Sequence, residues 1–207
     1  MGASLLAKVV NENAARLTPR SGVLLNLLVW AAETGNRHLR MNHRPSLHPV
    51  TVADIPEVLA FTLQARTELF PKLSAAGMPA DLEHFEAVYL HGDGRFLVAR
   101  FEGQVVAAVG YRPYDGRFPQ LKYQGVKVVE VVRLFVLPRF RRSGLAAELY
   151  RALTALAQVD GVEVIYLHTH PFLPGAIDFW VRQGFEIIDI EADPVWQTTH
   201  MQQRVIR

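Results

Sequence analysis

The 207-residue sequence contains no cysteine, which excludes a disulfide framework, thiolate chemistry and a cysteine-ligated metal. It also lacks the two common phosphate-loop motifs, because it has no Gly-x-x-x-x-Gly-Lys-Ser/Thr run and no Gly-x-Gly-x-x-Gly after a predicted strand. The chain also carries no large excess of positive or negative charge, since its formal net charge is only +2. The basic residues are scattered apart from Arg139, Arg141 and Arg142. This pattern argues against a nucleic-acid partner and favours one polyanionic ligand at the arginine cluster.

The apolar run at residues 23–32 is far shorter than the roughly 20 residues needed to cross a bilayer. We therefore expect no membrane partner and a cytoplasmic location. Residues 1–40 differ in character from the rest of the chain and are expected to form an N-terminal extension, mostly helical. Residues 41–207 are expected to form a single domain, because 50% hydrophobic residues suffice for a sizeable core.

From residue 47 onward, turn residues separate short β-branched runs from segments with helical periodicity. Asp54 and Pro56 are typical of a helix start, and Leu145, Leu149 and Leu153 form an apolar stripe at helical spacing. The pattern predicts an α/β (α+β) fold. The expected order is a strand near 47, helices at 51–69 and 81–90, strands at 96–101, 104–111 and 127–137, a helix at 143–157, a strand at 163–169, a helix at 174–183, and strands at 185–190 and 199–205.

The most informative segment is the strand ending at Leu137, followed by Pro138, the turn Arg141-Arg142-Ser143-Gly144 and a helix from Leu145. Unpaired N–H groups at a helix start carry the positive end of the helix dipole and bind anions. Gly144 lets the backbone approach such a ligand closely. A second signature is the segment 176–185, Ala-Ile-Asp-Phe-Trp-Val-Arg-Gln-Gly-Phe.

Together these segments resemble the GNAT superfamily of acetyl-CoA-dependent N-acyltransferases. Arg141-x-x-Gly144-x-Ala146 is similar to the family's Arg/Gln-x-x-Gly-x-Gly/Ala turn, and 176–185 is similar to its Ala-x-x-Phe-Tyr-x-x-x-Gly-Phe block. The resemblance covers residues 47–205. It implies a single-domain, mixed twisted sheet of about six to seven strands flanked by about four helices. The sheet is expected to splay between strands 130–137 and 163–169.

The resemblance also implies where acetyl-CoA, the co-substrate, would bind. Pantetheine would enter the splay and pair with the backbone of Leu134, Phe135 and Val136, and Phe179 would pack near the thioester. The pyrophosphate would rest on the turn and the helix start, formed by Arg141, Arg142, Ser143, Gly144, Leu145, Ala146 and Ala147. We expect no metal site, although His168 and His170 share a strand face.

Acetyl transfer to an amine needs a base, because an alkylammonium titrates near 10.4. Three residues are candidates: His168, Glu130 and His170. His168 is the first choice, because an imidazole that titrates near 6.5 suits base work at neutral pH. Two residues depart from the family pattern. Trp180 replaces a tyrosine that is thought to protonate the departing thiolate, and Leu173 replaces a frequent asparagine.

The expected function is therefore an acetyl-CoA-dependent N-acetyltransferase that acts by direct attack on the thioester. Two alternatives remain: a non-catalytic CoA-binding regulatory domain, suggested by Trp180, and a longer-chain acyltransferase. The acceptor would be a small-molecule amine or a peptide N-terminus, and the protein a homodimer paired through its C-terminal strands. The acceptor pocket is expected to be lined by Phe70, Pro71, Leu73, Met78, Phe85, Tyr111, Tyr114, Asp115 and Tyr123.

Overall fold

The computed structural model describes residues 44–73 and 76–205. The helical extension expected within residues 1–40, and its boundary with the domain, lie outside the described residues. Arg44–Arg207 forms one compact unit.

A seven-stranded sheet runs through this unit in the order β1-β2-β3-β4-β5-β7-β6. β4 and β5 pair in parallel and every other neighbouring pair is antiparallel, so the expected mixed sheet is confirmed. The strands are β1 (Ser46–Pro49), β2 (Arg95–Phe101), β3 (Gln104–Pro113), β4 (Val128–Val136), β5 (Val164–Thr169), β6 (Glu186–Ile190) and β7 (Thr199–Arg204).

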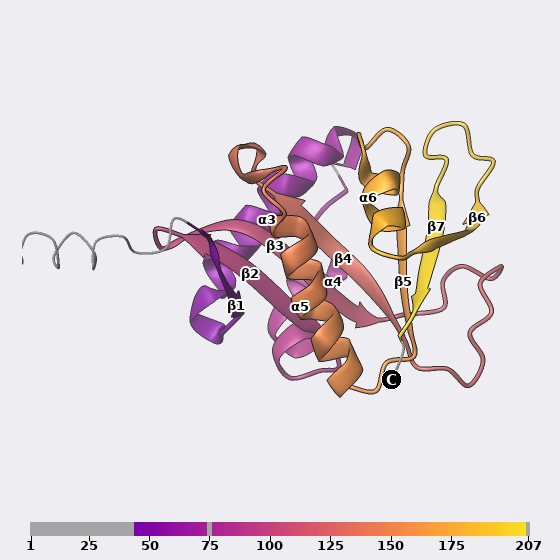
Figure 1. Ribbon diagram of the computed structural model, residues 1–207, viewed down its shortest axis with the longest axis horizontal. Coiled ribbons are helices and arrows are strands. Elements are labelled where there is room, and N and C mark those ends of the chain that lie inside the picture. Colours follow the sequence, from indigo (N-terminus) through magenta and orange to yellow (C-terminus); the bar gives the residue numbers. More distant parts are fainter. Residues whose placement is uncertain (1–43, 74–75, 206–207) are drawn as a thin grey trace, which may run out of the picture. The chain divides into compact units, whose positions relative to one another are not determined.

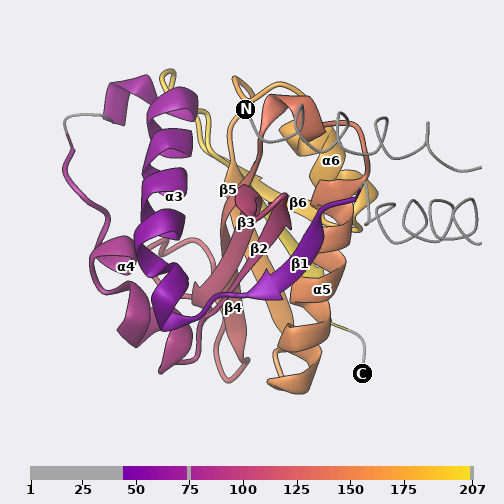
Figure 2. The same cartoon turned by 90° about the vertical axis from the view of Figure 1, so that its left-hand side faces the viewer.

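Four α-helices flank the sheet in the described part of the chain: α3 (Ile55–Leu69), α4 (Ala80–Glu83), α5 (Leu145–Val159) and α6 (Ala176–Arg182). Figures 1 and 2 show α3 and α4 on one face of the sheet and α5 and α6 on the other. None of these helices combines the length and the hydropathy that a membrane span requires. The order of strands and helices agrees with the order expected from the sequence.

The helix expected over residues 81–90 is wrong in one respect, because it is broken in two. α4 ends at Glu83, and a π-helical turn follows at Glu86–Leu90. Tertiary packing explains the break. Phe85, Tyr89 and Phe96 form a trio with every pair of ring centroids 4.9 Å apart, and the Tyr89 hydroxyl donates to Asp81. The hydrogen bond between Tyr89 and Asp81 joins the two pieces across the break.

The apolar stripe of α5 faces the sheet as its spacing predicts. Leu145, Leu149 and Leu153 are all buried, and they pack with strand residues such as Val109 and Ile165 into the larger core cluster. Burial of this stripe is the main apolar contribution that holds α5 on the sheet.

The sheet opens between its two parallel strands. β4 and β5 pair only where Val128–Glu130 meets Val164–Tyr166, after which β5 continues beside β7 and β4 beside β3. β4 also holds one extra residue, because Ala108 pairs with Phe135 while Gly110 pairs with Val132. The bulge contains Arg133, whose φ is +63°. The expected splay is thus confirmed, and it begins just beyond Glu130.

Replacing Leu149 by alanine should lower the free energy of unfolding by about 3 kcal/mol, because the residue is fully buried and its loss leaves a cavity. Urea denaturation measures the change. Val159→Ala, at the 85% exposed end of the same helix, is the control and should stay within about 0.5 kcal/mol of the wild type. Equal effects of the two variants would contradict the packing described for α5.

Candidate active site

A cleft of about 490 Å³ lies where β4 and β5 part. Residues 131–134 of β4 form one wall and residues 167–169 of β5 the other. The end of α3 contributes Leu69 and Phe70, and the start of α6 contributes Ala176 and Phe179. The volume is typical of a small-molecule site.

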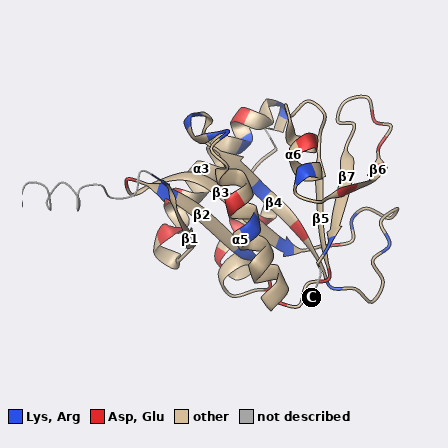
Figure 3. Cartoon of the chain, viewed as in Figure 1, with Lys and Arg blue, Asp and Glu red and all other residues tan. Residues whose placement is uncertain are grey.

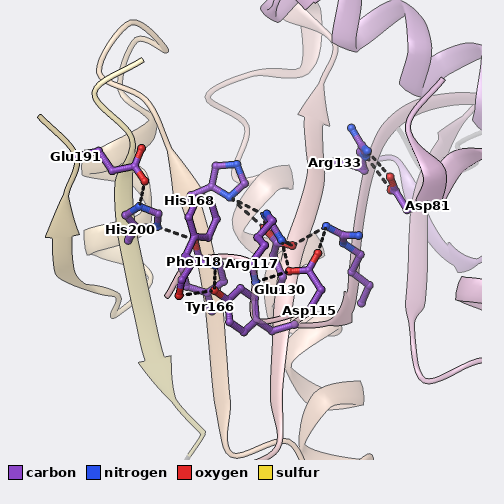
Figure 4. A network of polar contacts seen from close by, with 12 residues as sticks. Asp81, Asp115, Arg117, Phe118, Glu130, Arg133, Tyr166, His168, Glu191 and His200 are labelled. Atoms are coloured by element: carbon purple, nitrogen blue, oxygen red, sulfur yellow. Dashed lines mark hydrogen bonds and ion pairs between the residues drawn. The ribbon is translucent and has the colours of Figure 1, made fainter. Parts of the chain in front are cut away.

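Glu130 is the buried carboxylate at the closed end of this cleft. Its side chain is fully inaccessible to solvent, yet it is surrounded by hydrogen-bond donors (Figure 4). Arg112 Nη2 donates to Oε2 over 3.0 Å, both terminal nitrogens of Arg117 donate to the carboxylate, and His168 Nδ1 lies 3.0 Å from Oε1. Burial alone would raise the pKa of Glu130, but hydrogen bonds from His168 and Arg117 and their positive charge lower it to about 2.

The Glu130 contact also determines the tautomer of His168. A carboxylate with a pKa this low only accepts hydrogen bonds, so the nearby Nδ1 carries the proton and donates it to Glu130. Arg117 Nη2 also lies near His168 Nδ1, but at 3.5 Å it is farther away than the Glu130 oxygen. In the neutral form of the ring Nε2 is then the acceptor, and the partly exposed ring lines the cleft. This arrangement can remove a proton from a bound group.

Arg117 is a site residue that sequence reasoning missed. It lies in the loop between β3 and β4, outside any motif, and reaches Glu130 because the C-terminal strands hold the loop. Its guanidinium lies over the Phe118 ring at 4.8 Å, and that ring meets His200 of β7 edge-on at 4.6 Å. Tyr123 in the same loop donates to Gln202 of β7 over 3.0 Å. Only these tertiary contacts identify Arg117.

His200 is itself fixed by a buried chain of hydrogen bonds. Its Nδ1 lies 2.7 Å from the Tyr166 hydroxyl and its Nε2 lies 3.2 Å from Glu191 (Figure 4). His200 and Tyr166 are fully buried, and His200 pairs across the strands with His168. The rigid support under the Arg117 loop therefore comes from β5 and β7.

His170, the third candidate base, lies elsewhere. It is 8% exposed and is not among the described residues that line the cleft. Its Nδ1 lies 3.0 Å from the Trp196 carbonyl, to which it donates, and its ring stacks on Phe172. Burial lowers the pKa of His170 and the hydrogen bond to Trp196 only partly opposes this. The two rings of the His-x-His sequence lie 5.9 Å apart, but His168 lines the cleft and His170 does not.

The turn before α5 has the geometry expected of an anion site. Gly144 caps the helix with a φ of +87°, and Arg142 is also left-handed with a φ of +62°. Ser143 Oγ donates to the Phe140 carbonyl and holds the turn closed. Glu148 N–H makes the first backbone bond of the helix, to Gly144, so the preceding amides point toward the turn. Figure 3 shows basic residues on this turn.

The expected cofactor-binding residues fall into three groups. Leu134, Arg141, Ala146 and Phe179 line the cleft. Arg142, Ser143, Gly144 and Ala147 form the turn and the first helical turn next to it. Phe135 and Leu145 are buried, while the Val136 carbonyl already accepts a hydrogen bond from Arg141 Nε over 2.9 Å.

Both departures from the family pattern line the cleft, although Trp180 has mainly a packing role. It is 7% exposed and lies between Tyr150 and Phe185, with ring centroids at 5.3 and 5.2 Å. Leu173 forms part of the apolar lining beside Pro174.

The expected acceptor lining is mostly wrong, because Phe70 alone of its nine residues lines the cleft. Phe85 and Tyr111 are core residues with 2% and 1% exposure, and Tyr114, Asp115 and Tyr123 line a separate pocket. Arginines line the cleft in place of these aromatic rings: Arg112, Arg117 and Arg133. Arg133 is held by the buried Asp81, whose Oδ2 accepts from Nε over 3.1 Å.

Among the described residues, no group of three side chains could hold a metal ion.

Comparison with known proteins places this architecture in a family. The model of the acetyltransferase (GNAT) family matches residues 60–185, more than half of the chain. The uncharacterized N-acetyltransferase YjgM of Escherichia coli (strain K12) is 28% identical over 147 residues, which span 70% of this chain and 84% of that protein.

Solved structures share the fold at low sequence identity. A GNAT-family acetyltransferase from Staphylococcus aureus Mu50 superposes with a TM-score of 0.61 and 17% identity, over 78% of this chain and 99% of that one. An aminoglycoside 6'-N-acetyltransferase complexed with coenzyme A gives a TM-score of 0.59 and 14% identity, over 78% and 98% of the two chains. With the splayed sheet, the left-handed glycine turn before α5 and the family match in agreement, the chain belongs to the GNAT family of acetyltransferases.

Proposed function

We propose that this protein transfers the acetyl group of acetyl-CoA to a primary amine of a small molecule or peptide, with His168 as the base. The observation that carries the proposal is the His168–Glu130 pair, 3.0 Å apart, in the cleft of a GNAT-family chain. An orienting carboxylate behind an imidazole is a common arrangement for a general base.

The residues present suit acetyl-CoA. Beyond Glu130 the β4 edge that faces the cleft has no strand partner among the described residues, so its amides are available to pantetheine. The left-handed turn at Arg142 and Gly144 directs main-chain N–H groups of α5 toward a pyrophosphate, and Arg139 and Arg142 add positive charge at the exposed surface. Coenzyme A in the related 6'-N-acetyltransferase structure supports this assignment.

In the proposed reaction the acceptor ammonium gives one proton to Nε2 of His168, directly or through a water. The free amine then attacks the thioester carbonyl carbon, so that a C–N bond forms and the C–S bond breaks. The thiolate leaves with the electron pair of that bond, and it takes up, directly or through water, the second proton that the nitrogen loses as the neutral amide forms. A thiol with a pKa near 8.5 is a competent leaving group, so the indole of Trp180 is not needed as an acid.

Glu130 acts in this proposal as a positioning residue. A base must have room to accept a proton, whereas Arg112, Arg117 and His168 already occupy its oxygens. The low pKa that results makes the carboxylate a poor proton acceptor at neutral pH. Its charge instead orients His168 and stabilises the imidazolium that forms.

We also propose a cytoplasmic homodimer. The edge strand β6 supports this pairing, because Ile187 and Ile190 are exposed along it at 46% and 59%.

The coenzyme site is tested by isothermal titration with acetyl-CoA. Gly144→Ala should weaken binding at least about 10-fold, since a side chain strains this left-handed position and would shift the main-chain N–H groups assigned to the pyrophosphate. Gly161→Ala, at the other end of α5 with a φ of +70° and equally open space, should carry the same strain and bind normally. No binding to the wild type would exclude the assigned site.

The base is tested by amine-dependent thiol release over a panel of primary amines. His168→Asn should lower the rate by a factor of about 10² to 10⁴ while acetyl-CoA still binds. His91→Asn is the control, because His91 is exposed and contacts only Glu86 among the described ion pairs. A His168→Asn variant with normal turnover would rule out this base. Wild-type binding without release on any amine would favour a non-catalytic CoA-binding domain.

The buried carboxylate predicts an acid-sensitive fold. The pKa of Glu130 is about 2 in the native state against 4.5 as its ordinary value, so the unfolded chain takes up its proton first as the pH falls. Stability present above about pH 5 should therefore decline toward pH 2, by roughly 3 kcal/mol from this residue. Urea denaturation of Glu130→Gln between pH 6 and pH 3 should show a shallower decline than the wild type.

Glu83→Gln, at an exposed position of α4, is the matched control and should keep the wild-type slope. Some slope should remain in Glu130→Gln, because the buried Asp81 also has a lowered pKa: burial raises it, but the hydrogen bond and charge of Arg133 outweigh that effect. Identical slopes in Glu130→Gln and the wild type would show that Glu130 is not held ionised in the native state.

A further inference from the structure

We propose that the acceptor is a primary monoamine with an aromatic side group, and that this group packs against a cluster of four rings beside the cleft. The ring cluster consists of Phe70, His170, Phe172 and Trp196. The inference rests on the proposed acetyl transfer and deepens it, because it names the class of amine.

The ring cluster joins three segments that are distant in sequence. Phe70 follows α3, His170 and Phe172 lie in the loop before α6, and Trp196 lies between β6 and β7. His170 stacks on Phe172 with centroids 5.0 Å apart and an interplanar angle of 9°. Phe70 meets both of these rings edge-on at 5.8 and 5.9 Å, and Trp196 lies 5.6 and 6.0 Å from the same two rings.

The ring cluster is not a closed hydrophobic core, because several of its rings remain exposed to solvent. Phe172 leaves 45% of its surface exposed, and Phe70 and Trp196 are only partly buried. The cluster adjoins the cleft, because Phe70 lines it together with Leu69 and Leu173, and because the His170 ring lies 5.9 Å from the His168 ring. An aromatic group placed here would extend the edge-on packing while its amine reached toward His168.

The charges around the cleft disfavour an acceptor with a second ammonium group. Among the described residues that line it, Glu130 is the one carboxylate, and Arg112 and Arg117 already bind it. Four arginines share the same lining: Arg112, Arg117, Arg133 and Arg141.

The acidic side chains near the ring cluster are also occupied. Glu191 contacts His200, and Asp193 accepts from the backbone N–H groups of Val195 and Trp196. His170, which donates its Nδ1 proton to a carbonyl, adds no negative charge. A polycationic acceptor would therefore meet arginines without a carboxylate to pair with, whereas a monoamine would not.

The test compares thiol release with matched amines in the presence of acetyl-CoA. The kcat/KM for 2-phenylethylamine should exceed that for ethylamine at least about 10-fold, and 1,4-diaminobutane should be poorer than butylamine. Phe172→Ala should remove most of the preference for the ring, measured as the ratio of the kcat/KM values for 2-phenylethylamine and ethylamine. Val195→Ala, an exposed neighbour of Trp196, is the control and should keep the full preference.

Several results would overturn the inference while leaving acetyl transfer intact. These are equal kcat/KM for the amines with and without the ring, a preference for the diamine, or a Phe172→Ala variant that instead changes the choice between acetyl-CoA and hexanoyl-CoA.

Failure of the proposed function appears differently, as absence of thiol release with every amine. In that case calorimetry of 2-phenylethylamine against the CoA-saturated protein decides: ring-dependent binding lost in Phe172→Ala supports the inference, and no binding overturns it.

Discussion

The ionised carboxylate of Glu130, buried where β4 and β5 part, is the constraint on which the site depends. A buried charge is costly unless it is paired and fully hydrogen-bonded, and here four donor nitrogens from Arg112, Arg117 and His168 meet it. Each donor residue comes from a different element: β3, the loop before β4, and β5. Satisfying one carboxylate therefore brings three segments together at the closed end of the cleft and sets the orientation of the imidazole that faces it.

The same requirement links the cleft to distant parts of the chain. Arg117 reaches Glu130 from a loop that Phe118 holds in place. The Phe118 ring contacts both the Arg117 guanidinium and the His200 ring of β7. On the other side, Asp81 of α4 holds Arg133 in the β4 bulge. Two buried, paired carboxylates thus support the cleft: Glu130 at its base and Asp81 at its wall. The binding of substrate at the cleft and the stability of the fold share these contacts, which is why acid should affect both.

Much of the architecture was predictable from local pattern. The correct element order followed from the α5 stripe, the β-branched strands and the turn residues. Helical and strand periodicities are recognised within short runs of consecutive residues. The helix expected over 81–90 is interrupted after Glu83, where the Tyr89 hydroxyl bonds back to Asp81 and its ring packs with Phe85 on Phe96 of β2, and helical periodicity does not encode these contacts. The acceptor lining was mostly mispredicted for a related reason: aromatic residues such as Tyr111 suit a core as well as a pocket, and only burial distinguishes the two.

The sequence by itself determined the family, the splayed mixed sheet and the glycine turn before α5, because a helix start, its glycine cap and its flanking arginines are neighbours along the chain. Tertiary structure alone decided the chemistry of the cleft. His168 and His170 stand two residues apart with the same side chain, yet one faces Glu130 and the cleft while the other is buried against Trp196. Their partners are 38 and 26 residues away in the chain, so no local pattern distinguishes them; the pairing of β4, β5 and β7 does.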